Sequence, residues 1–507
     1  MADPQVLIVG AGPTGLVLAL WLAKAGIPVR LVDKAPAPGA TSRAVGVQAR
    51  TLEFYRQLGI ADAVVDAGVM VHAANLWSGG RKAGRLAFGD LGKGISPYPY
   101  MLIYPQDLHE RLHLRELDKL GVIAERPVEF LGLEQNQDHV LGRLRHSDGS
   151  EEIVKTAYVA GCDGAHSQVR ASLGIDFEGG TYEHIFYVAD VEADGAAVNG
   201  EVHVAPGDDD FLAIFPMKGK GRARLIGSVR ESALATDRPL TWDDANARTL
   251  DLVKLRVNKV NWFSTYRVHH RVASRFRDRR AFLLGDAAHV HSPVGGQGMN
   301  TGIGDAVNLA WKLADVLQGR GPATLLDSYE PERITFARKL VATTDRAFTF
   351  ITSRGLLAKR IRRVAPMLLG ALSRFRFLRR FLFLTISQIA INYRESSVST
   401  GKAGKVRGGD RLPWVQTTVN QDNFASLSTL AWQVHVYGVP RPGVVDACAE
   451  LRIPIHVFAW KSEMKRAGLM RGAIYLVRPD GHVALADPNG EANPLRHYLC
   501  RHWPPSP

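Results

Sequence analysis

The feature that most constrains the fold of this chain is a glycine-rich turn near its N-terminus, set between an apolar run and a helix-forming stretch. The run Gln5–Val9 is almost wholly apolar, which is typical of a strand buried on both faces of a parallel sheet. The turn that follows is Gly10-Ala11-Gly12-Pro13-Thr14-Gly15, with the spacing GxGxxG, and Leu16–Ala25 has a helical composition. A second apolar run, Pro28–Val32, ends in Asp33. These residues predict a strand–helix–strand unit that opens an α/β fold.

The glycines and the acidic residue of this unit indicate a bound dinucleotide. Gly10 permits the tight turn, Gly12 lets the backbone approach a pyrophosphate, and Gly15 lets the helix pack closely on the strand. The pyrophosphate would lie at the helix N-terminus, where free N–H groups and the helix dipole favour an anion. Asp33, about twenty residues beyond the turn, can bind an adenosine ribose and would repel the 2′-phosphate of NADP. The unit therefore predicts a Rossmann-like domain that holds FAD or NAD.

A second pattern, Gly285-Asp286-Ala287-Ala288-His289, follows the strand-like run Ala281–Leu284. An aspartate at the end of a strand can accept a hydrogen bond from a ribityl hydroxyl. The glycine-rich loop Ser292–Asn300 then enters a long predicted helix, Met299–Leu317. The N–H groups and dipole of such a helix can face the N1/O2 edge of a flavin, where the reduced ring carries negative charge. This pattern therefore indicates a flavin.

A third pattern, Cys162-Asp163-Gly164-Ala165-His166-Ser167-Gln168-Val169-Arg170, follows the apolar residues Tyr158–Ala160. With the three patterns in this order and spacing, residues 5 to about 345 resemble the para-hydroxybenzoate hydroxylase family, the single-component class A FAD-dependent aromatic monooxygenases. In that family the Asp-Gly turn of the third pattern lies near both FAD and the incoming NADPH. The resemblance implies that NADPH or NADH reduces FAD. It also implies that O2 adds as a C4a-hydroperoxyflavin, which passes one oxygen atom to a phenolic or polycyclic aromatic substrate.

The resemblance also assigns roles to individual residues. It implies FAD binding by Gly10, Gly12, Pro13, Thr14, Gly15, Asp33, Lys34, Arg43, Gln106, Val128, Asp163, Asp286, Gly298, Met299 and Asn300. Movement of the flavin between its two working positions would involve the glycine loop and an arginine on the ring's other side, which gives a catalytic set of Arg43, Pro293 and Gly296. A metal site at His289 and His291 is disfavoured, because the family uses this segment for flavin. No motif identifies the base that would take a phenolic proton.

The order of predicted strands and helices, together with the resemblance, predicts four parts of the chain. The region from about residue 182 to 266 has several β-like runs, and the region beyond Thr400–Gly409, which looks like a linker, has more. The predicted parts are a discontinuous FAD-binding domain (1–180 and 267–345), an interleaved substrate-binding β-sheet domain (181–266), a helical segment (346–399) and a C-terminal thioredoxin-like domain (410–507).

The C-terminal part resembles the thioredoxin-like appendage of phenol hydroxylases and aromatic polyketide hydroxylases. Its most family-like piece is Leu476–Ala484, which contains the hairpin turn Arg478-Pro479-Asp480-Gly481. The chain has only three cysteines, Cys162, Cys448 and Cys500, and no CxxC pair. Thiol–disulfide chemistry is therefore not expected there, and a structural or dimer-contacting role is the prediction.

The net charge of +13 is concentrated in one segment. Residues 346–394 contain ten arginines, one lysine and no acidic residue. A protein basic over its whole surface, as nucleic-acid binders tend to be, is not what this distribution predicts. The segment also contains aromatic residues and leucines, so we expect an amphipathic helix pair whose arginines reach solvent. A surface for a membrane or an acidic partner is the less favoured interpretation.

The sequence therefore predicts a cytoplasmic, FAD-dependent aromatic monooxygenase that consumes NAD(P)H and O2, works as a monomer or homodimer, and needs neither metal nor nucleic acid. An alternative stays open, in which the protein is a flavin dehydrogenase or reductase, for example of a polyprenyl or quinone substrate, and inserts no oxygen. The identity of the substrate, the position hydroxylated and the preference between NADPH and NADH cannot be deduced from these residues.

Overall fold

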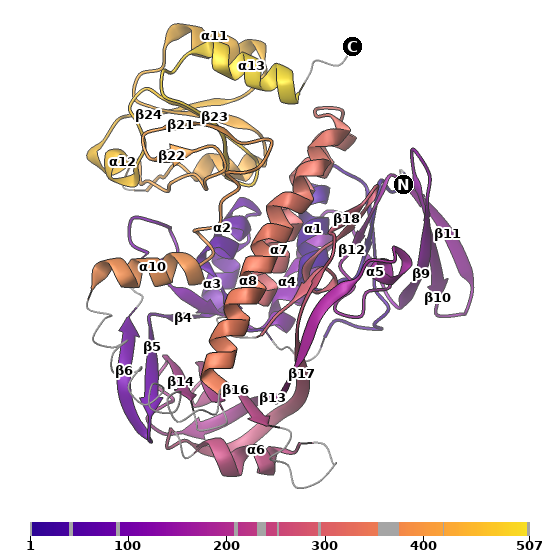
Figure 1. The fold of residues 1–507 in the computed structure, drawn as a ribbon, viewed down its shortest axis with the longest axis vertical. Coiled ribbons are helices and arrows are strands. Elements are labelled where there is room, and N and C mark those ends of the chain that lie inside the picture. Colours follow the sequence, from indigo (N-terminus) through magenta and orange to yellow (C-terminus); the bar gives the residue numbers. More distant parts are fainter. Residues whose placement is uncertain are drawn as a thin grey trace.

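The structure of the chain is a computed structural model, and it describes residues 3–39, 44–87, 92–206, 211–230, 240–250, 253–292, 296–352, 375–418 and 420–503. Figure 1 shows a large lower body of sheets and helices and a smaller upper body, which contains the C-terminal strands β21–β26. Within the described ranges, no helix combines the length and the apolar character that crossing a membrane would require.

The predicted strand–helix–strand unit is present. Strand β1 lies inside a six-stranded sheet with the order β18-β19-β12-β1-β2-β8 and pairs in parallel with β2 and β12. All four residues of β1 are buried: helix α1 packs on this sheet, and a Cβ atom at Gly142 of β10 (Val140–His146) would lie 2.8 Å from the Leu7 side chain. The α/β class is thereby confirmed. The strands of this sheet are β1 (Val6–Val9), β2 (Val29–Val32), β8 (Ala124–Glu125), β12 (Tyr158–Gly161), β18 (Arg277–Asp278) and β19 (Ala281–Leu283).

Three helices pack around the nucleotide end of this sheet. Helix α1 contacts both of the others, and its residues Gly15–Leu22 are all buried, which explains why its sequence is apolar on every side. Each helix follows a segment that carries a predicted site residue. These helices are α1 (Pro13–Lys24), α4 (Gln106–Asp118) and α7 (Gly298–Leu317).

The β-sheet predicted for the middle of the chain is larger than the sequence indicated. It has eight strands in the order β20-β17-β13-β16-β15-β14-β5-β6, and its two longest strands pair antiparallel along most of their length. Strands β5 and β6 come from a part of the chain that was assigned to the FAD-binding domain, and β5 joins by parallel pairing with β14. The members are β5 (Ala73–Ser78), β6 (Arg81–Ala87), β13 (Phe177–Asp194), β14 (Val202–Pro206), β15 (Phe211–Pro216), β16 (Arg222–Arg230), β17 (Arg256–Ala273) and β20 (His289–Val290).

Smaller elements fill the space between these sheets. One three-stranded sheet has the order β3-β7-β4 and brings Gly46 opposite Ile103. The other has the order β11-β10-β9 and lies at the side of the FAD-binding domain in Figure 1. The elements are β3 (Gly46–Val47), β4 (Val69–Val71), β7 (Met101–Ile103), β9 (Val128–Gln135), β10 (Val140–His146), β11 (Glu151–Thr156), α2 (Ala49–Gln57), α3 (Ala61–Ala67), α5 (Gln168–Ser172) and α6 (Trp242–Thr249).

The helical segment after the FAD-binding domain is described in part. Helix α8 (Tyr329–Thr352) packs on α7, and α10 (Arg376–Ile386) lies at the rim of the lower body in Figure 1. Residues 353–374, which belong to the predicted amphipathic helix pair, lie outside the described residues.

The C-terminal body is a six-stranded sheet with the order β22-β21-β26-β25-β23-β24, and α11 and α13 pack against each other beside it. The hairpin predicted around Arg478–Gly481 is confirmed, because β25 and β26 pair antiparallel. The elements are β21 (Thr400–Ala403), β22 (Val406–Arg407), β23 (Gln433–Tyr437), β24 (Ile455–Phe458), β25 (Ile474–Val477), β26 (Val483–Asp487), α11 (Pro442–Glu450), α12 (Ser462–Ala467) and α13 (Ala492–His502).

The prediction that Thr400–Gly409 is a linker is wrong. Its first residues form β21, which pairs in parallel with β26, so the segment belongs to the C-terminal sheet. The glycines that suggested flexibility are needed for close packing instead. A Cβ atom at Gly401 would lie 2.3 Å from the Ala486 carbonyl oxygen, and one at Gly409 would lie 2.3 Å from the Tyr393 carbonyl carbon.

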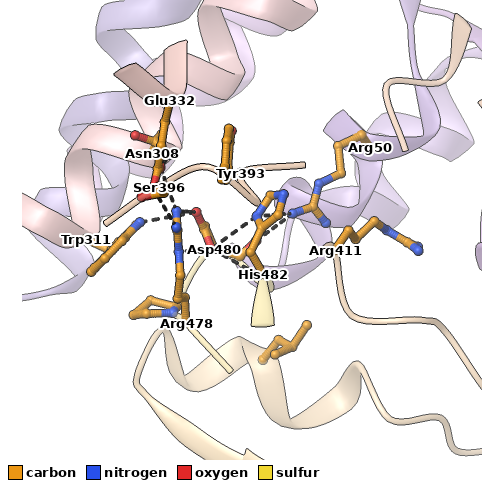
Figure 2. A network of polar contacts seen from close by, with 12 residues as sticks. Arg50, Asn308, Trp311, Glu332, Tyr393, Ser396, Arg411, Arg478, Asp480 and His482 are labelled. Carbon is orange, nitrogen blue, oxygen red and sulfur yellow. Dashed lines mark hydrogen bonds and ion pairs between the residues drawn. The ribbon is translucent and has the colours of Figure 1, made fainter. Parts of the chain in front are cut away.

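A buried network of charged groups joins the two bodies, and Figure 2 shows it from close by. At its centre is Glu332 of α8, whose side chain is 1% exposed. Its carboxylate accepts hydrogen bonds from Arg478 at 2.8 and 3.0 Å and from Lys312 at 2.9 Å. Asn308 and Ser396 donate to it as well, at 2.6 Å each. Burial alone would raise the pKa of Glu332, but the two cations lower it to about 2.

The C-terminal hairpin turn also belongs to this network. Arg478, with a fully buried side chain, also binds Asp480 within the turn at 3.1 and 2.5 Å. The Asp480 carbonyl oxygen accepts from Arg50 of α2 at 2.6 Å, and Trp311 of α7 donates to its carboxylate at 3.3 Å. Figure 2 shows His482 beside Tyr393, and their ring centroids lie 4.4 Å apart. The turn is therefore held by α2, α7 and α8 together.

We expect Arg478→Met to lower the free energy of unfolding by about 3–5 kcal/mol, because it leaves Asp480 buried without its arginine and Glu332 with Lys312 as its remaining cation. The matched control is Arg496→Met, which removes a surface ion pair with Glu450 and should cost ~0–1 kcal/mol. Urea unfolding of the three proteins makes the comparison. Equal losses in both variants would show that the buried network does not join the bodies energetically.

Candidate functional site

The predicted dinucleotide turn has the geometry of an anion site. A Cβ atom at Gly10 would lie 2.3 Å from the Cys162 carbonyl oxygen, and one at Gly15 would lie 2.0 Å from the Gly10 carbonyl oxygen. Both positions therefore require glycine. Gly12, by contrast, has open space in front of it, with no described atom within 4 Å of an added Cβ. Gly12 is also the N-cap of α1, with Pro13 in the first turn and no side-chain cap bond recorded, so the first N–H groups face that space.

The adenosine side of the turn is organised around Asp33. Its carboxylate accepts hydrogen bonds from the backbone N–H groups of Ala11 at 2.7 Å and Ala35 at 2.8 Å. Arg126, which sequence reasoning missed, lies 3.4 Å from the same carboxylate and donates to the Ala11 carbonyl oxygen at 3.1 Å. Lys34 is exposed. No motif marks Arg126, because it reaches the turn only through the pairing of β2 with β8.

The second pattern packs directly on the first. A Cβ atom at Gly285 would lie 2.7 Å from Oγ1 of Thr14, and one at Gly302 would lie 2.3 Å from the same oxygen. Thr14 of the first pattern is therefore enclosed by the Gly285 turn and by helix α7. Asp286 is exposed although its neighbours Gly285 and Ala287 are buried, so its side chain points out of the core where a bound ribityl chain would pass.

Asp305 of α7 holds the second pattern in place, and sequence reasoning missed it. Its buried carboxylate accepts from the Gly285 N–H at 3.0 Å, from Nε of Arg333 at 2.6 Å, and shares a 2.7 Å hydrogen bond with Nε2 of His289. Burial alone would raise the pKa of Asp305, but Arg333 and His289 lower it. No sequence signal singles out Asp305, because α7 also contains the polar residues Asn308, Lys312 and Asp315.

The interpretation of His289 and His291 as metal ligands gains no support. His289 is engaged by Asp305, and His291 Nδ1 bonds the Ser292 carbonyl oxygen at 2.7 Å. Burial lowers the pKa of His291 to about 4. Among the described residues no cluster of three or more His, Cys, Asp or Glu side chains could hold a metal ion.

Asn300, at the start of α7, connects two glycine segments that face each other. Its amide nitrogen donates to the carbonyl oxygens of Gly46 at 2.9 Å and Gly296 at 2.8 Å. Its amide oxygen accepts from the Gln48 N–H at 2.9 Å and from Thr51 at 2.7 Å. A Cβ atom at Gly296 would lie 4.0 Å from the Cα atom of Gly46. The two backbones thus approach closely at the predicted flavin ring, with Gly298 and Met299 half-buried beside them.

The remaining predicted residues are placed less directly. The Gln106 N–H donates to Ala44, next to the segment that holds Arg43, and its side chain donates to Glu110 at 3.0 Å. The Val128 N–H donates to the Asp33 carbonyl oxygen, which sets its backbone at the adenosine side. Asp163 caps α5 by accepting from the N–H groups of Gln168 and Val169. Direct FAD contacts of these residues stay predictions, and Arg43 and Pro293 lie outside the described residues.

The three predicted patterns therefore lie together. The first touches Cys162 of the third through Gly10, and the second through Thr14. The open face of Gly12 suits a pyrophosphate, and the carboxylates of Asp33 and Asp286 are of the kind that bind the hydroxyls of an adenosine ribose and a ribityl chain. These features define a protein that binds FAD through a Rossmann-like domain.

Comparison with known proteins places the chain within a family. Residues 3–344 match the family described as FAD binding domain. The 6-methylpretetramide 4-monooxygenase of Streptomyces rimosus is 37% identical over 80% of this chain and 72% of its own length. The pentachlorophenol 4-monooxygenase of Sphingobium chlorophenolicum is 32% identical over 81% of this chain and 76% of its own. The chain belongs to this family of class A FAD-dependent aromatic monooxygenases.

A solved structure extends the likeness to the whole chain. The anhydrotetracycline hydroxylase OxyS from Streptomyces rimosus superposes with a TM-score of 0.80 at 27% sequence identity, and the match covers 99% of both chains. The C-terminal body is thus part of the shared architecture. The sequence predictions of FAD as cofactor and of a flavin monooxygenase are confirmed at the level of the class.

We expect Asp286→Ala to weaken FAD binding roughly ten- to a hundredfold, since a hydrogen bond from a ribityl hydroxyl to a carboxylate contributes about 1.5–3 kcal/mol. Flavin fluorescence titration measures the change. Asp446→Ala, which removes an exposed carboxylate of α11, should bind FAD like the parent protein. Parental affinity in Asp286→Ala would show that Asp286 does not touch the cofactor.

Proposed function

We propose that this protein hydroxylates a polycyclic aromatic compound that carries a phenolic ring, using O2 and NADPH or NADH. The observation that carries the proposal is the likeness to an anhydrotetracycline hydroxylase over 99% of this chain, together with that to a 6-methylpretetramide 4-monooxygenase over 80% of it. A monocyclic phenol is the second candidate, because the pentachlorophenol monooxygenase is also a relative. The names of these relatives favour oxygen insertion over the dehydrogenase or reductase alternative.

An apolar cluster beside the predicted flavin ring supports an aromatic substrate. The buried members of this cluster come from the sheet β3-β7-β4, from the residue before β3, and from strands β5 and β14 of the eight-stranded sheet: Val45, Val71, Ala74, Ile103 and Val202. Val45 precedes Gly46 in the chain, and Ile103 pairs with Gly46, so the cluster adjoins the point where Gly46 approaches Gly296. Met101, Val204 and Phe215 pack on it and are only half-buried. These side chains can contact the flat faces of an aromatic ring system and exclude water from it.

The chain's own residues would bind and position, while FAD, when bound, supplies the activation of O2 and the transfer of an oxygen atom. Gly12 and Thr14 would hold the pyrophosphate, and Asp33 with Arg126 the adenosine. Asn300 would keep Gly46 and Gly296 at the distance that admits the flavin edge, because it hydrogen-bonds to both carbonyl groups. Arg43, Pro293 and Gly296 remain the proposed catalytic set, with Arg43 placed by resemblance on the other side of the ring.

For the C-terminal body we propose a thioredoxin-like fold with a structural role. Its mixed sheet flanked by α11 and α13 supports the fold, and its hairpin turn in the buried network supports the role. Cys448 is buried and Cys500 is exposed, and neither has a disulfide partner. Free thiols suit a reducing compartment, so we propose that the protein works in the cytoplasm, as a monomer or homodimer.

The test is to follow NADPH oxidation, O2 uptake and product mass with a panel of polycyclic and monocyclic phenols. We expect polycyclic phenols to stimulate NADPH oxidation most and to gain one oxygen atom that derives from 18O2. Preferential hydroxylation of monocyclic phenols would favour the second candidate. Turnover that proceeds without O2, or a product that gains no oxygen from 18O2, would contradict the proposed function.

A further inference from the structure

Helix α10 presents an apolar face that the fold does not use. In the described part of the chain three phenylalanines are exposed, and all three belong to this helix or to its N-cap: Phe375 at 55%, Phe377 at 73% and Phe381 at 64%. Phe377 and Phe381 are one helical turn apart and therefore form a stripe. Exposed aromatic side chains that gather on one element often mark an interaction surface.

The opposite face of α10 is the one that packs on the rest of the protein. Phe383 is 5% exposed and packs against Gly92 and Pro99, so closely that a Cβ atom at Gly92 would lie 2.5 Å from its ring. Leu384 packs on the same core cluster. Because α10 is apolar on two sides and only one of them is buried, packing among the residues that the structure describes does not explain its sequence.

The exposed stripe lies in the most basic part of the chain. Arg376 and Arg380 precede Phe377 and Phe381 by one position each, and Arg380 is exposed. The surrounding segment 346–394 contains eleven basic residues and no acidic one. A partner for this surface must therefore be both apolar and anionic. A bilayer with anionic lipids has this combination, since phenylalanine enters the boundary of the acyl chains while arginine reaches the phosphates.

The helix is firmly attached to the rest of the protein. The side chain of Gln297, just before α7, donates to the Ile386 carbonyl oxygen at 2.8 Å and accepts from Gln388 at 2.6 Å. The Arg50 N–H donates to the Ser387 carbonyl oxygen at 3.1 Å. The stripe is thus fixed relative to the flavin site, and Figure 1 shows α10 at the rim of the molecule. A rigid, rim-placed helix can rest on a flat surface without a change of fold.

We propose that α10 docks this protein on anionic lipid bilayers, with Phe377 and Phe381 entering the interface and the neighbouring arginines binding lipid phosphates. The sequence made membrane contact the less favoured interpretation of segment 346–394, because arginines that reach solvent would have explained its charge. They do not explain the exposed phenylalanines. The proposal is independent of the reaction, since docking requires neither flavin turnover nor an aromatic substrate.

The experiment is flotation of the purified holoenzyme with vesicles at physiological salt. The vesicles consist of phosphatidylcholine alone, or of phosphatidylcholine and phosphatidylglycerol in equal parts. We expect binding to the anionic vesicles only. Phe377→Ser with Phe381→Ser should reduce binding at least roughly tenfold. Arg376→Gln with Arg380→Gln should reduce it by a similar factor, at roughly fivefold for each arginine near the surface. The FAD content of each variant shows whether it is folded.

Two matched controls distinguish docking through α10 from nonspecific hydrophobic adsorption and from an effect of net charge. Ile123→Ser with Ile153→Ser removes exposed apolar side chains at 72% and 68%, and Arg441→Gln with Arg466→Gln removes exposed arginines of the C-terminal body. Both should bind like the parent protein. Absence of binding to anionic vesicles, or equal losses in the controls, would overturn the proposal. A dimer in sedimentation velocity that the phenylalanine variant abolishes, without vesicle binding, would assign the stripe to self-association instead.

Discussion

The buried carboxylate of Asp305 is the interaction on which most of the flavin site depends. It binds the Gly285 N–H and His289 on one side and Arg333 on the other, all without contact with solvent. A buried charge is tolerated only when it is paired and its hydrogen bonds are satisfied. The turn before Asp286, the strand residue His289 and helix α8 must therefore keep their positions relative to α7. Local chain flexibility at the glycines is restricted in this way.

From Arg333 the same kind of interaction continues to the C-terminal body. Arg333 donates to Tyr393 at 2.9 Å, and the ring of Tyr393 packs at a tilt against His482, which follows the C-terminal hairpin turn. One residue earlier on α8, Glu332 binds Arg478. Of these two neighbours on α8, Arg333 therefore binds the carboxylate that holds the Gly285 turn, and Glu332 binds the C-terminal body. Buried ion pairs often fix the geometry of a fold more than they increase its stability. We therefore infer that the C-terminal body holds the flavin site in position and is not an independent module.

The nucleotide-binding half of the fold could be predicted from sequence because its signals are local. The spacing of Gly10, Gly12 and Gly15 follows from backbone contacts within one turn. A Cβ atom would clash at Gly10 and Gly15, whereas Gly12 faces open space. The long helix α7 and the hairpin at Arg478–Gly481 were predictable for the same reason. Residues 353–374 and Arg43 lie outside the described residues, so the predictions there remain as they were.

What could not be predicted depends on contacts between distant segments. Strand β5 belongs to the substrate sheet only because it pairs with β14, far along the chain. The glycines of 400–409 looked flexible, although close backbone packing requires them, for example of Gly401 against Ala486 of β26 and of Gly409 against Tyr393. Arg126 and Asp305 are single residues without a motif, and their importance is visible only when the turns they hold are seen beside them. The exposed stripe of α10 could not be recognised from the sequence, because its composition also suits a packed helix.

We infer that the site is preorganised to bind a dinucleotide flavin at both ends, through Asp33 and the Gly12 turn as well as through Asp286 and the glycine loop. Titration of the flavin-free protein with FAD and with FMN tests it most directly, because FMN lacks the adenosine half. We expect FAD to bind at least roughly a hundredfold more tightly than FMN, since the pyrophosphate and ribose contacts together contribute more than ~2.7 kcal/mol. Equal affinity for the two flavins, or no binding of FAD, would contradict it.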